Sequence, residues 1–190
     1  MKVNFPYGKE IQSLDIPEER LRGVLVSSLH HYTPKAAPMD LVEEALLHPI
    51  GSKPLCELAR GKQNVVLIAS DHTRPVPSKV IVPPMLREIR RGNPDADITI
   101  LIATGCHRET TREELTGKFG EEIVNREKIV IHDCDLSPLA KIGTLPSGGE
   151  CIINKLVVDA ACSRGSLPHS GTFTSHRRMR KPLGSGTSRS

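Results

Sequence analysis

Residues 65–77 read VVLIASDHTRPVP, and this stretch decides the fold. Its first five residues form a short, wholly apolar run, which is typical of a β-strand buried on both faces of a sheet. Similar runs occur at 98–103 and 128–132, and residues 78–91 between the first two predict a helix. Because strands that alternate with helices form parallel sheets, we predict an α/β fold: a Rossmann-like parallel sheet with flanking helices.

Shorter elements surround this predicted sheet. We expect residues 1–25 to be extended and rich in turns. Apolar spacing and turn residues predict short helical segments and a pair of short strands; the helical segments are 38–47, 54–60, 110–116 and 121–125, and the strands are 141–144 and 150–155.

The last part of the sequence, residues 163–190, differs in composition from the rest. Of its 28 residues 14 are Gly, Ser or Thr, and neither helical nor strand periodicity is visible. Such a segment buries too little apolar surface to offset its ordering entropy, so we predict a low-complexity, disordered tail after a domain that spans 1–162.

Charge and cysteine usage narrow the class of protein. Six of the 26 basic residues and no acidic residue lie in 163–190, which leaves 20 basic against 22 acidic residues, a net charge of −2, for 1–162. A nucleic-acid partner would depend on the tail alone, and we expect none. The five cysteines are scattered without a Cys-x-x-Cys pair, which argues against a disulfide framework or a structural zinc site. With no signal-peptide run and no apolar stretch of about 18 residues, we expect no membrane association and a cytoplasmic location.

A polar loop follows the first predicted strand. It brings together the acid Asp71, the imidazole of His72, the hydroxyl of Thr73 and the guanidinium of Arg74. The loop amides and Thr73, next to the N-terminus of the following helix, suit a phosphate. Arg74 suits a carboxylate or phosphate, which a guanidinium binds through paired hydrogen bonds. The alternative is a structural loop in which Asp71 caps backbone amides and pairs with Arg74.

A second loop, Thr104-Gly105-Cys106-His107-Arg108, follows the second predicted strand. Its glycine allows close approach of a ligand to the backbone. His107 suits general acid–base catalysis near neutral pH, and the alternative is a merely solvated histidine. Ligands bind at the carboxyl ends of parallel strands, so we expect Arg74 and His107 to face one another there if the two strands are neighbours.

With these two loops the sequence resembles the nickel-dependent lactate racemase family, over about residues 5–159. The most specific part is Asp-His-Thr-Arg-Pro at 71–75 combined with Thr-Gly-x-His-Arg at 104–108. Further matching segments are Pro-Tyr-Gly at 6–8, HPIGS at 48–52 and LPSGGECIINK at 145–155.

The resemblance implies a cofactor, a pyridinium bisthiocarboxylate mononucleotide that holds nickel in an S-C-S pincer, and a small 2-hydroxyacid such as lactate as substrate. In that family the pincer accepts the C2 hydride of lactate and returns it to either face of pyruvate. By residue match, His107 is an acid–base group and Arg74 binds the substrate carboxylate. Asp71, His72, Thr73 and Arg74 line the mononucleotide part of the cofactor, and no residue of this chain is assigned to the metal.

The resemblance stops after residue 159. The family continues with a Glu-Gly-Phe-Ile segment, a second catalytic His, a Lys bonded to the cofactor, a His on nickel and a second domain, none of which is recognisable here. Those roles are therefore not assigned to His169, His176 or Lys181. A reading-frame change near Ala161 is one explanation, because recoding 162–167 one base earlier permits Leu-Leu-Glu-Gly-Phe-Ile.

The sequence is consistent with three hypotheses about the function. We predict a lactate racemase-like N-terminal domain, an isomerase fragment that is inactive without the second domain. The alternatives are a non-catalytic domain that binds the cofactor or a nucleotide phosphate and, less favoured, a nucleic-acid-binding protein that uses the basic tail.

Overall fold

The computed structural model describes residues 1–162, and it separates into two compact units, the first ending at Ala36 and the second beginning at Ala37. The disorder predicted for 163–190 lies outside the described residues. The domain boundary predicted at residue 162 stays a prediction.

The first unit is built around a β-hairpin. Strand β1 (Lys2–Tyr7) pairs antiparallel with β2 (Glu10–Asp15), with Lys2 opposite Asp15 and Tyr7 opposite Glu10. Two short 3-10 helices follow, η1 (Glu18–Arg20) and η2 (Ser28–His31). The sequence indicated extended chain and turns here, but it did not predict the hairpin or its register.

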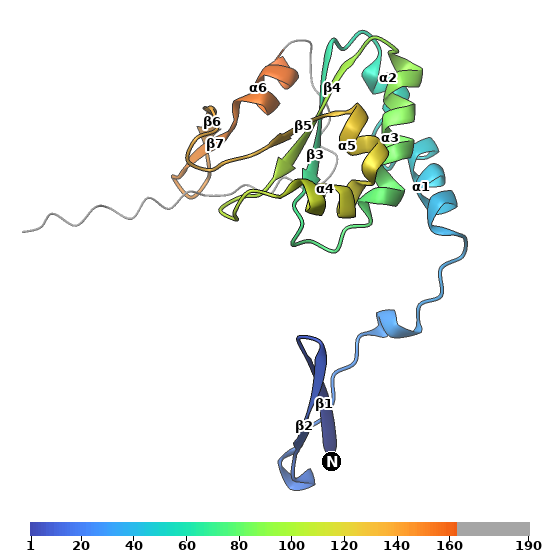
Figure 1. Ribbon diagram of the computed structural model, residues 1–190, viewed down its shortest axis with the longest axis vertical. Coiled ribbons are helices and arrows are strands. Elements are labelled where there is room, and N and C mark those ends of the chain that lie inside the picture. The colour runs from blue at the N-terminus through green and yellow to red at the C-terminus, as the bar shows by residue number, and fades with distance from the viewer. Residues whose placement is uncertain (163–190) are drawn as a thin grey trace, which may run out of the picture. The chain divides into compact units, whose positions relative to one another are not determined.

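The second unit contains the predicted parallel sheet, and the α/β class is confirmed. Its strands are β3 (Asn64–Ser70), β4 (Asp97–Ala103) and β5 (Lys128–Ile131), in the order β3-β4-β5 and all parallel (Figure 1). The central strand β4 is buried along almost its whole length, which explains why its sequence is apolar without alternation.

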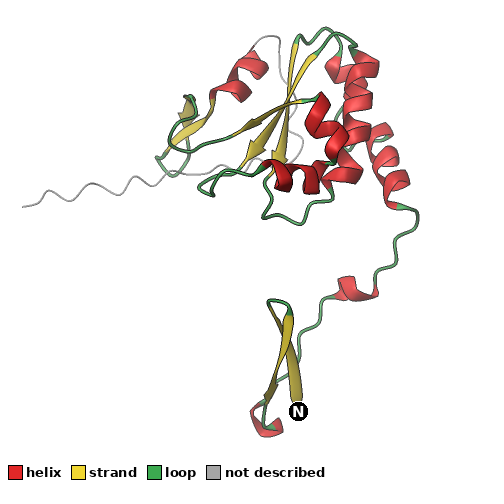
Figure 2. Ribbon diagram, viewed as in Figure 1, coloured by secondary structure: helices red, strands yellow, loops and turns green. Residues whose placement is uncertain are grey.

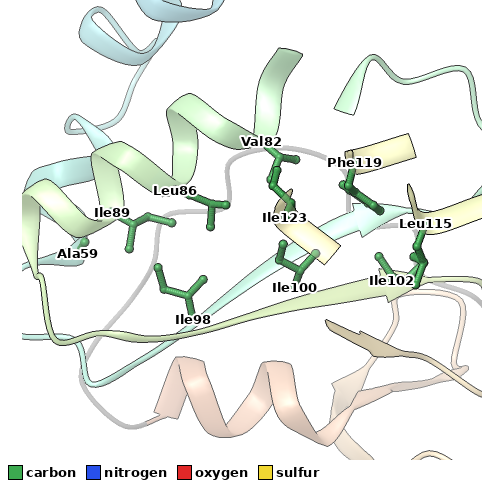
Figure 3. Close-up of a cluster of buried hydrophobic side chains, with 10 residues drawn as sticks. All are labelled: Ala59, Val82, Leu86, Ile89, Ile98, Ile100, Ile102, Leu115, Phe119 and Ile123. Atoms are coloured by element: carbon green, nitrogen blue, oxygen red, sulfur yellow. The ribbon is translucent and has the colours of Figure 1, made fainter. Parts of the chain in front are cut away.

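Helices cover one face of this sheet. They are α2 (Leu55–Ala59), α3 (Ser78–Gly92), α4 (Arg112–Phe119) and α5 (Glu121–Arg126), and α1 (Pro38–Leu47) packs against α3 (Figure 2). Figure 3 shows Ile98, Ile100 and Ile102 of β4 pointing toward α3 and the α4–α5 pair. Together with these three side chains, the core contains Ala59, Val82, Leu86, Ile89, Leu115, Phe119 and Ile123.

The other face of the sheet carries the last described helix, α6 (Lys155–Cys162), which contacts β3 (Figure 3). It follows the hairpin of β6 (Leu139–Thr144) and β7 (Glu150–Asn154). The hairpin was predicted and α6 was not. Its start is marked by Asn154, whose side-chain oxygen accepts the Leu156 N–H at 2.9 Å in the manner of a helix N-cap. Within residues 1–162, no helix combines the length and the apolar character needed to cross a membrane.

Candidate functional site at the carboxyl edge of the sheet

The two polar loops leave neighbouring strands at the same level. Ser70, the last residue of β3, is paired with Ala103, the last residue of β4. The loops that begin at Asp71 and Thr104 therefore start side by side at the carboxyl edge of the sheet, where parallel α/β sheets bind ligands.

The centre of this edge is a contact between Asp71 and His107. The Asp71 side chain is 2% exposed, and its Oδ2 is hydrogen-bonded to Nδ1 of His107. Its other oxygen, Oδ1, accepts hydrogen bonds from the Thr73 hydroxyl at 2.7 Å and the Thr73 backbone N–H at 3.2 Å. A carboxylate with both oxygens occupied in this way is a fixed acceptor rather than a mobile surface charge.

These contacts keep Asp71 ionised. Burial by itself would raise the pKa of the carboxyl, but the hydrogen bonds from His107 and Thr73 outweigh it, and the net pKa lies below the ordinary value of 3.8. Near neutral pH an ionised Asp71 favours a proton on Nδ1 of His107, so the neutral ring carries its free lone pair on Nε2.

His107 is fixed on one side and open on the other. Its backbone N–H donates to the Thr104 carbonyl at 3.1 Å, closing a tight turn in which Gly105 has a φ of 62°. Its side chain remains 42% exposed. The imidazole is thus held by Asp71 while its side chain remains partly accessible to a ligand.

His72 points into a second polar cluster. Its Nδ1 lies 3.1 Å from the Thr110 hydroxyl and 3.6 Å from Oε2 of Glu114. Glu114 also binds Arg108 through two hydrogen bonds of 2.5 and 2.9 Å and completes a capping box with Thr111 at the start of α4. Hydrogen bonds from Arg108 and then from the Thr111 amide lower the pKa of Glu114 to about 2.

The sequence reasoning missed this second cluster. A signal for it was present, because Thr111 and Glu114 have the spacing of a capping box, which fixes the glutamate at the first turn of a helix. That turn follows directly on the His107 loop, so Glu114 had to lie near it.

Arg74 differs from its three neighbours. The structural alternative had it paired with Asp71, but Asp71 binds His107 instead. Within residues 1–162 no hydrogen bond or ion pair engages the Arg74 guanidinium, and the residue is exposed. Its backbone carbonyl accepts a hydrogen bond of 2.9 Å from Nζ of Lys118 on α4. Desolvation lowers the pKa of Lys118, although the charge of Asp71 acts in the opposite direction.

A third strand end belongs to the same edge. The Thr104 hydroxyl donates to the backbone carbonyl of His132, directly after β5, and Nδ1 of His132 lies 3.1 Å from the side-chain nitrogen of Asn154. The first contact ties the His107 loop to the end of β5, and the second connects the end of β5 to the end of β7.

The donor set at this edge suits an anionic, phosphate-bearing ligand. Arg74 is a cation without a side-chain partner among residues 1–162, Lys118 lies next to it, and the loop leads into the N-terminus of α3, where backbone amides favour negative charge. The hydroxyl of Ser70 is buried and has no hydrogen-bond partner among the described residues. Asp71, by contrast, is an occupied acceptor and unsuited to bind a phosphate directly. Its predicted place beside the cofactor stays a prediction, as do those of His72, Thr73 and Arg74.

A separate cavity of about 550 Å³ lies between α4, α5 and β5. It is lined in part by Arg112, Leu115 and Ile131, and by none of the predicted site residues. The predicted site residues therefore lie outside the lining of this cavity.

Comparisons with known proteins agree with the two-loop pattern. Residues 7–166 match the family described as lactate racemase N-terminal domain. The chain is 52% identical over 159 residues to a lactate racemase of Lactiplantibacillus plantarum and 50% identical over 159 residues to one of Thermoanaerobacterium thermosaccharolyticum. Each match covers 83% of this chain, but only 38% and 37% of the respective relative.

A solved structure gives the same result. The lactate racemase apoprotein from Thermoanaerobacterium thermosaccharolyticum superimposes with a TM-score of 0.73 at 48% identity. The match covers 84% of this chain and 37% of that structure, so the chain spans well under half the length of the relatives it matches.

Proposed function

Since the chain belongs to the lactate racemase N-terminal domain family, we propose that its sheet edge forms one part of a lactate racemase active site. The reaction is the interconversion of the two enantiomers of a small 2-hydroxyacid. The observation that carries the proposal is the contact of buried Asp71 with half-exposed His107.

His107 would move the proton of the substrate hydroxyl. With Nδ1 donating to Asp71, the neutral imidazole presents Nε2 as the base, and the ionised Asp71 stabilises the imidazolium that forms. When the hydroxyl is restored, the same nitrogen returns the proton. An imidazole held at two points, by Asp71 and by its own backbone turn, loses little freedom when the substrate binds.

Arg74 would bind the substrate carboxylate. Its guanidinium is exposed and uncommitted within the described residues, so it can form paired hydrogen bonds with a carboxylate without first breaking an ion pair. Fixing the carboxylate at Arg74 and the hydroxyl at His107 determines where the hydrogen on C2 points, since both groups are attached to the same short molecule.

The nickel-pincer mononucleotide, when bound, would supply the acceptor and donor for the C2 hydride. The amides near the start of α3 would hold its phosphate, next to Arg74. In this proposal Asp71 acts through His107 rather than by touching the cofactor, while Thr73 fixes Asp71 in turn.

Other parts of the proposal concern the rest of the protein. A racemase needs an acid–base group on each side of the substrate. We place the second group and the remaining substrate contacts in the portion of the relatives that this chain does not match. The 190 residues alone are then expected to bind ligand but not to racemise lactate. We also propose that residues 1–162 form the lactate racemase-like domain and that the protein is located in the cytoplasm.

A chimera tests the function directly. Residues 1–162 would replace the matching N-terminal portion of the Lactiplantibacillus plantarum relative, and the purified chimera, loaded with matured cofactor, would be assayed for interconversion of D- and L-lactate. We expect racemisation. His107→Gln should lower kcat by about 10²- to 10⁴-fold, the usual contribution of a positioned acid–base group. Arg74→Lys, which keeps the charge but loses the paired geometry, should mainly raise KM.

The matched control is His31→Gln, which removes an exposed histidine of the first unit and should leave kcat and KM unchanged. A chimera that folds, takes up the cofactor and turns over lactate equally well with and without His107 would refute the proposal. Tight binding of cofactor by a chimera without any turnover would favour the non-catalytic alternative.

A further inference from the structure

We propose that Cys106 and Cys134 are a reversible redox pair, which a small-molecule disulfide such as oxidised glutathione converts into an intramolecular disulfide beside His107. The bond itself does not depend on the proposed racemase function. Only its consequence for activity does.

The two cysteines lie on neighbouring strand ends that are tied together. Ile102 of β4 is paired with Ile131 of β5, and the His132 N–H donates to the Ile102 carbonyl at 3.0 Å. One step further along, the Thr104 hydroxyl donates to the His132 carbonyl. Cys106 and Cys134 each follow that last tie by two residues, one on each strand end. These ties hold the ends of β4 and β5 side by side, so the two cysteine-bearing loops begin next to each other.

The two thiols lie close enough to interact. Cys106 is among the causes that raise the pKa of the Cys134 thiol, and both residues are free cysteines. Cys106 is exposed and Cys134 is half-buried, so a soluble disulfide reaches Cys106 first. The other described cysteines lack this arrangement: within residues 1–162, Cys56 is buried and binds the Arg91 guanidinium, and Cys151 lies on β7 without a thiol neighbour.

The chemistry is a double thiol–disulfide exchange. The Cys106 thiolate attacks one sulfur of oxidised glutathione, the glutathione S–S bond breaks, and one glutathione thiolate leaves. The Cys134 thiolate then attacks the sulfur of Cys106, forms the new S–S bond and expels the second glutathione thiolate. The protein loses two electrons and two protons, and glutathione disulfide becomes two glutathione thiols.

The second exchange should depend on pH. Desolvation, followed by the nearby carboxylate of Asp135, raises the pKa of the Cys134 thiol above its ordinary value of 9.0. Cys134 is therefore mostly protonated near neutral pH, and its attack on the mixed disulfide becomes faster as the pH rises.

The disulfide would act on the site through the peptide chain. Cys106 directly precedes His107, and an S–S bond of about 2.05 Å is shorter than any contact between two thiols. Bond formation draws the loop toward Cys134, on the side of β5, whereas Asp71 holds His107 from the side of β3. Oxidation is expected to weaken the Asp71–His107 contact and so to lower activity.

Peptide mapping of the full 190-residue chain tests the bond. Trypsin cleaves after Arg91, Arg108, Lys128 and Lys141, so Cys106 and Cys134 fall in separate peptides, 92–108 and 129–141, with one cysteine each. After incubation with oxidised glutathione we expect these two peptides to be linked, with a mass two hydrogen atoms below their sum. The linked species should exceed any other cysteine pairing by about tenfold and should disappear on reduction.

Kinetics and variants complete the test. Conversion of the mixed disulfide to the linked form should accelerate roughly tenfold for each pH unit below the pKa of the Cys134 thiol. Cys106→Ser and Cys134→Ser should each abolish the linked peptide, whereas Cys151→Ser should leave its yield unchanged. Glutathione that remains attached to Cys106, or linkage of Cys134 to Cys151 or Cys162 in comparable yield, would overturn the proposal. Because the readout is peptide mass, these outcomes are independent of whether the chimera racemises lactate.

Discussion

Ile100 in the middle of β4 and Asp71 just beyond β3 are almost equally hidden, with exposed fractions of 0% and 1%. Ile100 is surrounded by apolar side chains from α3, α4 and α5. Asp71 is held by polar partners, Thr73 and His107, at the end of the sheet. The interior of the sheet and its carboxyl edge thus achieve the same burial through different interactions.

The interior and the edge differ in what a substitution leaves behind. An apolar side chain removed from the interior leaves a cavity, and the cost is lost contacts. A polar side chain removed at the edge leaves its partners buried without a hydrogen bond, and the cost depends on pH when the group is ionised. The edge can therefore be altered by pH or by a ligand, whereas the interior cannot.

The interior should show the largest loss of stability. Ile100→Ala removes a fully buried side chain and is expected to lower the free energy of unfolding by about 4 kcal/mol. Urea denaturation at neutral pH measures it. Ile68→Ala, at a residue of β3 that is 40% exposed, is the matched control and should cost about 1 kcal/mol. Equal losses at the two positions would mean that burial against the helices does not dominate.

Asp71→Asn should cost less, about 2 kcal/mol near pH 7, because a charge-assisted hydrogen bond is lost while the shape is kept. The Asp71 pKa is lower in the folded protein than its ordinary value of 3.8, so its contribution is fully present above that value and is lost as the pH falls through the folded pKa.

Denaturation curves at pH 7 and at successively lower pH values below 4 check this behaviour. The wild type and Asp71→Asn should converge in stability in acid. A constant gap between them at all pH values would show that the carboxylate charge is not the cause. Asp95→Asn, at an exposed position, should change stability by less than about 0.5 kcal/mol throughout.

Loss of the capping box should have a smaller effect. Thr111→Ala removes the hydroxyl that accepts the Glu114 N–H at 3.3 Å and is expected to cost about 1 kcal/mol. Thermal or urea unfolding followed by circular dichroism measures it. Thr116→Ala, in the interior of α4, is the control and should not destabilise, since alanine is the better helix former there.

The smallest effect is expected at the exposed ion pair of the edge. Arg108→Ala should change the free energy of unfolding only slightly, because the Arg108 side chain is 60% exposed and solvent screens the pair. Any loss of stability should appear as a matching rise in the pKa of Glu114 above about 2, because the same interaction with Arg108 causes both, and an NMR titration of the carboxyl carbon would show that rise. A pKa that stays near 2 would assign the shift to the Thr111 amide instead of Arg108.

The sequence predicted the interior better than the edge. The strands around Leu67, Ile100 and Ile129 could be located because a fully buried parallel strand requires an uninterrupted apolar run, which is a local property. Both polar loops could be placed at one edge because each directly follows one of these parallel strands. Helix α6 was missed because its residues 156–158, Leu-Val-Val, are as apolar as those of β7, and only the N-cap geometry of Asn154 shows that the helix begins there.

The partners of each polar side chain could not be read from the sequence. Asp71 has Arg74 three residues away but binds His107, which is 36 residues away, because the order of the strands brings the second loop next to the first. The contact of Cys106 with Cys134 arises in the same way from the pairing of β4 with β5.

By itself, then, the sequence determined the class of fold, the family and the edge of the sheet where polar residues gather. These follow from periodicity and local motifs, which act between residues close in the chain. Only the tertiary structure decided that Asp71 binds His107, that Arg74 stays uncommitted within the described residues, and that two thiols meet beside the imidazole. A hydrogen bond tolerates a change of only a few tenths of an ångström in the distance between donor and acceptor. For residues far apart in the chain, strand order and register set that distance.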